Sequence, residues 1–238
     1  MDRSLLTGVV LAGGLARRMQ GGGVSVPAPD SSQPAVRGAF AQAETMPVSR
    51  REKGLLMLAG EPLVAGACRV LRPYVQTMLI SANRETDRYG LHGTVIRDDP
   101  ALGEDVGPLA GVARALACAQ TPWLAALPVD VVNVPVDLVA ILAAAARRAG
   151  VRAAYVMHGG RAHPLCLVAR TDLAGDVRDY LLRGDRKVQL WLDRIEALAV
   201  PFSADSDAFF NINTPVDLQR AEALFRRRPA SLSARGPE

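Results

Sequence analysis

A glycine-rich loop follows the first apolar run of the chain and leads directly into arginines. The run ends in Leu11 and Ala12, the loop contains Gly13 and Gly14, and Arg18 follows shortly after. Bare backbone N–H groups beside an arginine favour binding of a triphosphate. The spacing matches neither G-x-G-x-x-G nor G-x-x-x-x-G-K-[ST], so neither standard phosphate loop is present. The alternative is an ordinary turn with solvated arginines.

A carboxylate closes another apolar run, WLAALPV, which ends in Asp130. Because ligands bind at the carboxyl ends of parallel strands, we expect Asp130 in the same crevice as the glycine loop. Proteins hold Mg²⁺ with one or two carboxylates together with substrate phosphates, so Asp130 is a candidate magnesium ligand. A turn or capping aspartate is the alternative interpretation.

Further amides and carboxylates follow other predicted strands. Asn83 could hydrogen-bond a base or sugar, and Asp98 or Asp99 could hold a ribose hydroxyl. In the alternative interpretation all three form turns with their own backbone. Asn211 and Asn213 lie close together in FFNINTP, and one of them could face the crevice and help to hold a metal.

The elements that must position these residues alternate between strands and helices. Apolar runs predict strands at 5–12, 76–82, 94–97, 123–128, 151–157 and 164–169. Helical patterns begin near Pro62, Gly107, Pro135 and Thr214, and Thr214 is the expected N-cap of the last helix. This alternation implies βαβ units, an α/β fold with a mainly parallel sheet flanked by helices in three layers.

The domain organisation follows from length and composition. The 238 residues fit a single domain over 1–227. Residues 20–52 are rich in Gly, Pro, Ser and Ala, and are predicted to be either a disordered insertion or a partly ordered lid. Residues 228–238 are predicted to be a disordered tail.

Bulk composition excludes several classes of protein. No apolar stretch is long enough for a membrane span, and no signal peptide is recognisable, so we expect a cytoplasmic protein without a membrane partner. The three cysteines are widely spaced within apolar segments and predict reduced core residues. The net charge of +4 is scattered and aromatic residues are few, which argues against a nucleic-acid partner.

The order of the motifs is more specific than any one of them. The chain contains in turn LAGGLARRM, EKGLLMLAGEPL, SANR, RDD, GPLAG, LPVD and NINTP. This order resembles the nucleotidyltransferases of the glycosyltransferase-A-like superfamily, which have a Rossmann-like fold. The stretches GPLAG, RAHPL, GDRKVQLWL and NINTPVDL resemble the molybdenum cofactor guanylyltransferase family in particular. The resemblance runs from about Leu5 to Phe225 and excludes residues 20–52.

The resemblance implies roles for individual residues. It implies Lys53, Arg18 and Asp130 as catalytic residues, and Asp130 with Asn213 as the Mg²⁺ ligands. The implied nucleotide-binding residues are Leu11, Ala12, Gly13, Gly14, Lys53, Asn83, Asp98 and Asp130. The implied pterin-binding residues are Arg161, His163, Arg186 and Lys187, for which a hairpin and a solvated helix start are the alternative interpretation.

The implied reaction is attack of the terminal phosphate of molybdenum-molybdopterin on the α-phosphorus of GTP, with release of pyrophosphate. Molybdoenzymes or their chaperones are implied as further partners. Three alternatives are a molybdopterin cytidylyltransferase, a sugar-phosphate nucleotidyltransferase of the same fold, and a non-catalytic nucleotide-binding or cofactor-binding adaptor.

Two positions depart from the family pattern. Glu52 stands before Lys53, after the long insertion, where the family has an aspartate close to the glycine loop. Val129 stands where the family commonly has a cysteine, a change that we expect to affect packing alone. A long insertion can bring its ends together at slowly rising entropic cost, so we expect Lys53 to reach the phosphates.

Overall fold

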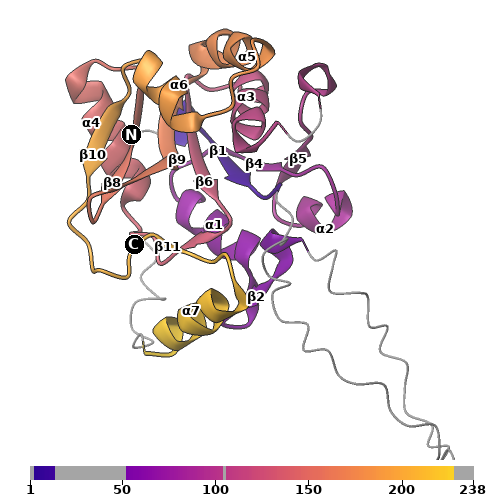
Figure 1. Ribbon diagram of the computed structural model, residues 1–238, viewed down its shortest axis with the longest axis vertical. Coiled ribbons are helices and arrows are strands. Elements are labelled where there is room, and N and C mark those ends of the chain that lie inside the picture. The colour runs from indigo at the N-terminus through magenta and orange to yellow at the C-terminus, as the bar shows by residue number, and fades with distance from the viewer. Residues whose placement is uncertain (1–2, 14–51, 104–105, 228–238) are drawn as a thin grey trace, which may run out of the picture.

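The computed structural model describes residues 3–13, 52–103 and 106–227 (Figure 1). Its centre is a seven-stranded sheet with the order β10-β8-β9-β6-β1-β4-β5. The strands are β1 Leu6–Leu11, β4 Thr77–Ser81, β5 Thr94–Ile96, β6 Trp123–Pro128, β8 Ala153–His158, β9 Arg161–Arg170 and β10 Leu198–Pro201. Every residue of β1 and β6 is buried, as expected of central strands covered on both faces.

The sheet is mainly parallel, as predicted. β1 pairs in parallel with β4 and with β6, and β4–β5 and β8–β10 are also parallel. β9 alone among these seven strands runs antiparallel to its neighbours, β6 and β8. A turn at Gly159 and Gly160 joins β8 to β9, with φ angles of 55° and 72° that favour glycine in a two-residue hairpin.

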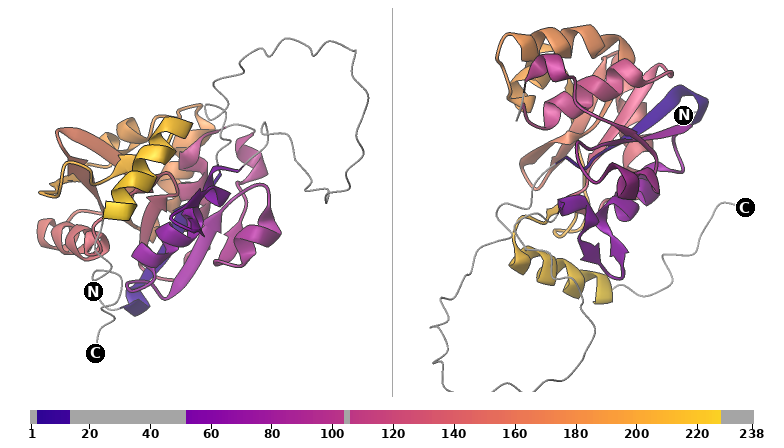
Figure 2. Two further views of the ribbon diagram at one scale, coloured as in Figure 1. Left: turned by 90° about the horizontal axis from the view of Figure 1, so that it is seen from below. Right: turned by 90° about the vertical axis from the view of Figure 1, so that its right-hand side faces the viewer.

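Helices cover both faces of the sheet, which confirms the three-layer α/β prediction (Figures 1 and 2). Helices α1 Leu63–Leu71 and α4 Leu138–Ala149 contribute to one hydrophobic core. Helices α3 Pro108–Cys118, α5 Ala174–Leu182 and α6 Val188–Arg194 contribute to the other. Val10 and Val9, successive residues of β1, point into the first and second core respectively, as the alternation of a strand requires.

Smaller elements surround the carboxyl ends of the central strands. They are the 3₁₀ turns η4 Lys53–Leu55 and η5 Pro100–Leu102, helix α2 Thr86–Gly90, and the strand pairs β2 Met57–Leu58 with β3 Glu61–Pro62 and β7 Val131–Val132 with β11 Phe210–Asn211. Two further 3₁₀ turns lie at Arg3–Leu5 and Thr171–Leu173. Helix α7 Pro215–Arg227 lies against the β2–β3 hairpin, where Ala59 N donates to Glu222 Oε1 at 2.9 Å (Figures 1 and 2).

All six strands predicted from the sequence are present. β10 and α5 were not among the predicted elements. The predicted tail lies outside the described residues, as does the predicted insertion apart from Glu52. In the part of the chain that is described, no helix is both long enough and apolar enough to cross a bilayer.

Candidate active site

A cleft opens at the carboxyl ends of β1, β4 and β6, with a volume of about 210 Å³. Its walls include Leu11–Gly13, Ser81, Asp98, Lys53, Asp130 and the first turn of α3. These segments lie far apart in the sequence, and the parallel sheet brings their ends to one edge. This edge is where α/β sheets bind their ligands, so the predicted crevice is present.

The glycine loop is fastened to the neighbouring strand. The backbone N–H groups of Ala12 and Gly13 both donate to the carbonyl oxygen of Ser81, each at 2.9 Å. These two donors are therefore already satisfied, although both residues line the cleft. Gly14 and Arg18 lie outside the described residues. The predicted use of this backbone for nucleotide binding stays a prediction, and Ser81 is a structural partner that the sequence did not reveal.

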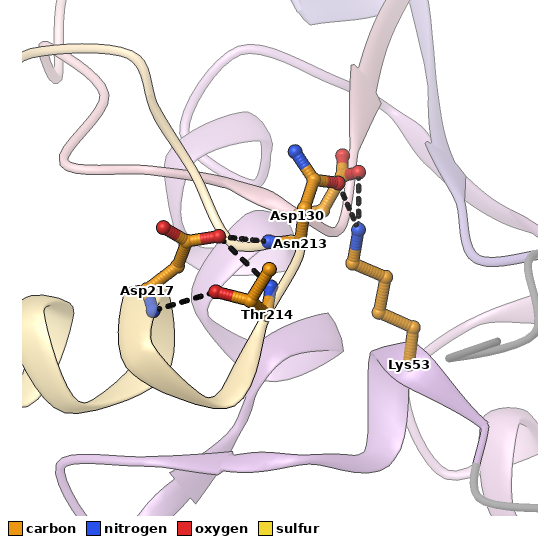
Figure 3. A network of polar contacts seen from close by, with 5 residues as sticks. All are labelled: Lys53, Asp130, Asn213, Thr214 and Asp217. Carbon is orange, nitrogen blue, oxygen red and sulfur yellow. Dashed lines mark hydrogen bonds and ion pairs between the residues drawn. The ribbon is translucent and has the colours of Figure 1, made fainter. Parts of the chain in front are cut away.

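Lys53 and Asp130 both line the cleft, and their side chains meet that of Asn213 (Figure 3). The Lys53 ammonium donates to Asp130 Oδ2 at 2.7 Å and to Asn213 Oδ1 at 2.9 Å. The lysine side chain is 12% exposed and the aspartate side chain 27% exposed, so the pair is partly shielded from water. The structure therefore brings Lys53 to Asp130, whereas its contact with the phosphates of a substrate stays a prediction. Both Asn211 and Asn213 are exposed, but Asn213 is the one that contacts Lys53.

A capping arrangement holds Asn213 at the start of α7 (Figure 3). Asp217 Oδ2 accepts from the backbone N–H groups of Asn213 at 3.0 Å and Thr214 at 2.8 Å, and Thr214 Oγ1 accepts from Asp217 N at 3.1 Å. Burial opposes ionisation of Asp217, but these hydrogen bonds and the Lys53 charge lower the pKa of its carboxyl below the ordinary value. The predicted N-cap at Thr214 is present. The spacing T-x-x-D was the available signal for Asp217.

Asn83 and Asp98 form a closed pair across the ends of β4 and β5. Asn83 Nδ2 donates to Asp98 Oδ2 at 2.8 Å, and the Asp98 backbone N–H donates to Asn83 Oδ1 at 3.0 Å. Asp98 lines the cleft. Asp99 instead caps the turn at Pro100 through Ala101 N at 3.0 Å, and this hydrogen bond is the largest cause of its lowered pKa. Adjacent aspartates therefore have different environments, and Asp98 is the one placed to meet a ligand.

The first turn of α3 closes the remaining side of the cleft. Gly107 and Gly111 line it, so the helix presents its N-terminus, where partial positive charge favours anions. A Cβ atom at Gly111 would lie 2.4 Å from Ser81 Oγ, which leaves room for glycine alone. Val129 is buried, lines the cleft, and donates its N–H to Leu11 O at 3.1 Å.

The four predicted pterin-binding residues do not line this cleft. Arg161 and His163 lie on β9, where the His163 ring is 5.3 Å from that of Phe209. Burial, and then the nearby charges of His158 and Arg161, lower the pKa of His163. Arg186 instead donates to the carbonyl oxygens of Leu181 and Asp185, and Lys187 precedes α6. Their pterin role stays a prediction.

Comparison with known proteins identifies the family. The model of the MobA-like NTP transferase domain matches residues 8–198. The chain belongs to this family. It is 37% identical over 212 residues to a protein named molybdenum cofactor guanylyltransferase from Yersinia pseudotuberculosis, covering 89% of this chain and 92% of that one. A Yersinia pestis protein of the same name matches with the same identity and coverage.

Two solved structures support the fold. One is molybdopterin-guanine dinucleotide biosynthesis protein A from Archaeoglobus fulgidus, with a TM-score of 0.66 and 24% identity, covering 93% of this chain and 100% of that one. Another is a nucleotidyl transferase from Methanothermobacter thermautotroptrophicus, with a TM-score of 0.63, 22% identity and coverage of 94% and 98%. At these identities the likeness shows the fold. The family match, the named relatives and this fold together show that the chain is an enzyme, a nucleotidyltransferase.

Proposed function

We propose that this protein transfers GMP from GTP to the terminal phosphate of molybdenum-molybdopterin. The observation that carries the proposal is the meeting of Lys53, Asp130 and Asn213 beside a cleft at the sheet's carboxyl edge. The substrates come from the relatives at 37% identity, which are named molybdenum cofactor guanylyltransferases. Delivery of the product to molybdoenzymes or their chaperones in the cytoplasm is part of the proposal.

The chemistry places simple demands on the protein. An oxygen of the pterin phosphate forms a bond to the α-phosphorus of GTP, and the bond from that phosphorus to the β-phosphate oxygen breaks. The electron pair of the broken bond leaves with pyrophosphate. A phosphate monoester is already anionic near neutral pH, so no strong base is required. The protein must hold two anions in line and neutralise charge that builds up on the leaving group.

The oxygen atoms at the site fit a magnesium ion. Asp130 Oδ2 and Asn213 Oδ1 already converge on one positive charge, the Lys53 ammonium. Within the described residues no group of three His, Cys, Asp or Glu could hold a metal by itself. That fits Mg²⁺, which proteins usually bind through one or two side chains together with substrate phosphates and water. When bound, Mg²⁺ would draw charge from the phosphates and hold them in line.

The side chains around the cleft have separate roles in this proposal. Asp130 and Asn213 hold the cation, and Lys53 turns from Asp130 towards the phosphates, where its charge stabilises the transition state. Asn83 and Asp98 contact the nucleotide together, and the backbone of Leu11–Gly13 holds its guanine part. Gly14 and Arg18, which lie outside the described residues, are proposed to extend the nucleotide and phosphate contacts.

A nucleotide panel tests the proposal. The purified protein is given each of the four NTPs with Mg²⁺ and molybdenum-molybdopterin, and pyrophosphate is measured. Release with GTP that depends on both the pterin and Mg²⁺, and is lost in Asp130→Ala, is expected. Release with CTP instead would assign a cytidylyltransferase, and release that requires a sugar phosphate would assign a different substrate class. No release with any acceptor, despite tight GTP binding, would favour an adaptor.

A further inference from the structure

The residue before Lys53 is a buried charge. Glu52 is 5% exposed, and its Oε1 accepts from Arg84 Nε at 2.8 Å. A carboxylate removed from water is tolerated when a cation pairs with it, and becomes strongly destabilising when that cation is lost. The position of Glu52 therefore depends on Arg84, a residue 32 positions away that follows the end of β4 by three residues.

The turn that carries Lys53 starts from Glu52. Leu55 N donates to Glu52 O at 3.1 Å, and Leu56 N donates to Lys53 O at 3.2 Å. The carboxylate and the catalytic lysine are thus parts of one short 3₁₀ turn. A shift of Glu52 would move the backbone from which the Lys53 side chain extends.

The residue after Lys53 is held by the same neighbouring segment. A Cβ atom at Gly54 would lie 2.7 Å from Tyr89 Oη, so this glycine packs directly on the tyrosine. Tyr89 is fully buried in α2, five residues after Arg84. Both neighbours of Lys53 are therefore fixed by residues 84–89, one through an ion pair and the other through close packing.

We propose that Arg84 is a positioning residue for Lys53, acting through Glu52. Arg84 is 57% exposed and does not line the cleft, so it is placed to act on the turn and not on the substrate. This role rests on the proposed function of Lys53. The pairing of Glu52 with Arg84 also explains how Lys53 is held in place although a long insertion precedes it. Glu52 is the last residue of that insertion, and its buried carboxylate fixes the chain directly before Lys53.

The lysine content of the chain provides a readout that needs no substrate. The chain has two lysines, Lys53 and Lys187. The side chain of Lys53 is 12% exposed, whereas Lys187 is an exposed residue. Brief acetylation followed by mass spectrometry gives the labelling ratio of Lys53 to Lys187. Arg84→Ala should raise this ratio several-fold. Arg84→Ala combined with Glu52→Gln should restore it, because a neutral amide does not require the cation.

Arg88→Ala is the matched control. Arg88 lies on the same segment, is similarly exposed, and pairs with the exposed Glu85 at 3.7 Å. Its removal should leave the ratio unchanged. An unchanged ratio in Arg84→Ala, or no restoration in the double variant, would overturn the proposal. If Arg84→Ala does not fold, Arg84→Gln replaces it. Its amide keeps one donor for Glu52, so the labelling ratio of Lys53 to Lys187 should rise by a smaller amount. An unchanged ratio in this variant would also overturn the proposal.

Kinetics separates positioning from general stability. Arg84→Ala should lower kcat for GMP transfer by about ten- to a hundredfold, as expected for a displaced catalytic group. In the Lys53→Ala background the same substitution should change kcat less than twofold. An equal loss in both backgrounds would show that Arg84 acts independently of Lys53. If the wild type transfers no GMP, the proposed function fails, whereas the labelling ratio still decides the role of Arg84.

Discussion

Lys53 and Asp130, 77 residues apart in the chain, join their side chains at 2.7 Å, and Asn213 accepts from the same ammonium. The ammonium thereby occupies the space between two oxygen atoms that are proposed to hold Mg²⁺. A cation cannot use these oxygens fully while Lys53 remains between them. Movement of Lys53 towards phosphate and occupation of the site by metal are therefore expected to occur together.

Replacing Lys53 by Met should strengthen metal binding in the absence of nucleotide. The substitution keeps the apolar stem and removes the competing charge. Affinity for Mn²⁺, used as a spectroscopic probe, should rise by about fivefold, since a partly exposed ion pair is worth up to ~1 kcal/mol. GMP transfer should fall by roughly 10²-fold or more. Electron paramagnetic resonance titration measures the first effect. Lys187→Met is the control, and equal Mn²⁺ affinity in all three proteins would argue against competition.

Asn213→Ala should reduce activity whereas Asn211→Ala should not. The two asparagines lie on one short segment, and Asn213 alone of the two contacts Lys53. We expect kcat/KM to fall about tenfold in the first variant, because the proposed Mg²⁺ site loses one of its two side-chain oxygen ligands. The Mg²⁺ concentration required for half-maximal rate should also rise. Identical kinetics in the two variants would remove Asn213 from the site.

Gly111→Ala should both destabilise the fold and narrow the cleft. Its Cβ atom would lie 2.4 Å from Ser81 Oγ, so the Ser81 hydroxyl must rotate or the helix must shift, at a typical cost of about 1–3 kcal/mol. Urea denaturation and titration with GTP measure the two effects. Gly175→Ala is the matched change, since nothing lies within 4 Å of its new Cβ. Unaltered GTP affinity in Gly111→Ala would show that the nucleotide does not use this wall.

The unfolding free energy should depend on pH through Asp217. Its pKa is lowered in the folded state, so its carboxylate stabilises the protein at pH values above the unfolded pKa of about 4. This contribution disappears as the pH falls through the lowered folded value. Asp217→Asn should therefore be less stable than the wild type at pH 7, by about 0.5–2 kcal/mol as for other helix caps. The difference should shrink towards pH 3. Urea titrations at both pH values test this, and a gap that widens in acid would contradict it.

The main strands were predictable because burial on both faces leaves an unmistakable apolar run. LTGVVL and WLAALP are buried at every position, and both were predicted. β10 is only Leu198–Pro201, and four residues beside a loop give too little pattern. The direction of β9 was not visible either, because an apolar run has the same composition in a parallel and an antiparallel strand.

The site was predictable in its residue types more than in its contacts. Asp98 and Asp99 are neighbours at a strand end, and sequence alone cannot say which one faces the cleft. Lys53 was placed by resemblance, since a long insertion separates it from the glycine loop. The burial of Glu52 depends on Arg84, which is distant in sequence, and charged residues are usually assigned to the surface. The contacts of Lys53 with Asp130 and with Asn213 join residues far apart in the sequence, so no local pattern could predict them.

The partners of Asp130 come from both directions along the chain. Lys53 precedes it, whereas Asn213 follows and depends on Asp217 at the start of the last described helix. During synthesis on the ribosome, the sheet strands from β1 to β9 can therefore emerge and pair while the proposed catalytic cluster is still incomplete. A nascent chain or truncated product that ends before Asn213 would carry the residues that line the cleft but lack this partner of Lys53. The proposed catalytic cluster is thus completed only after the strands of the central sheet have been made.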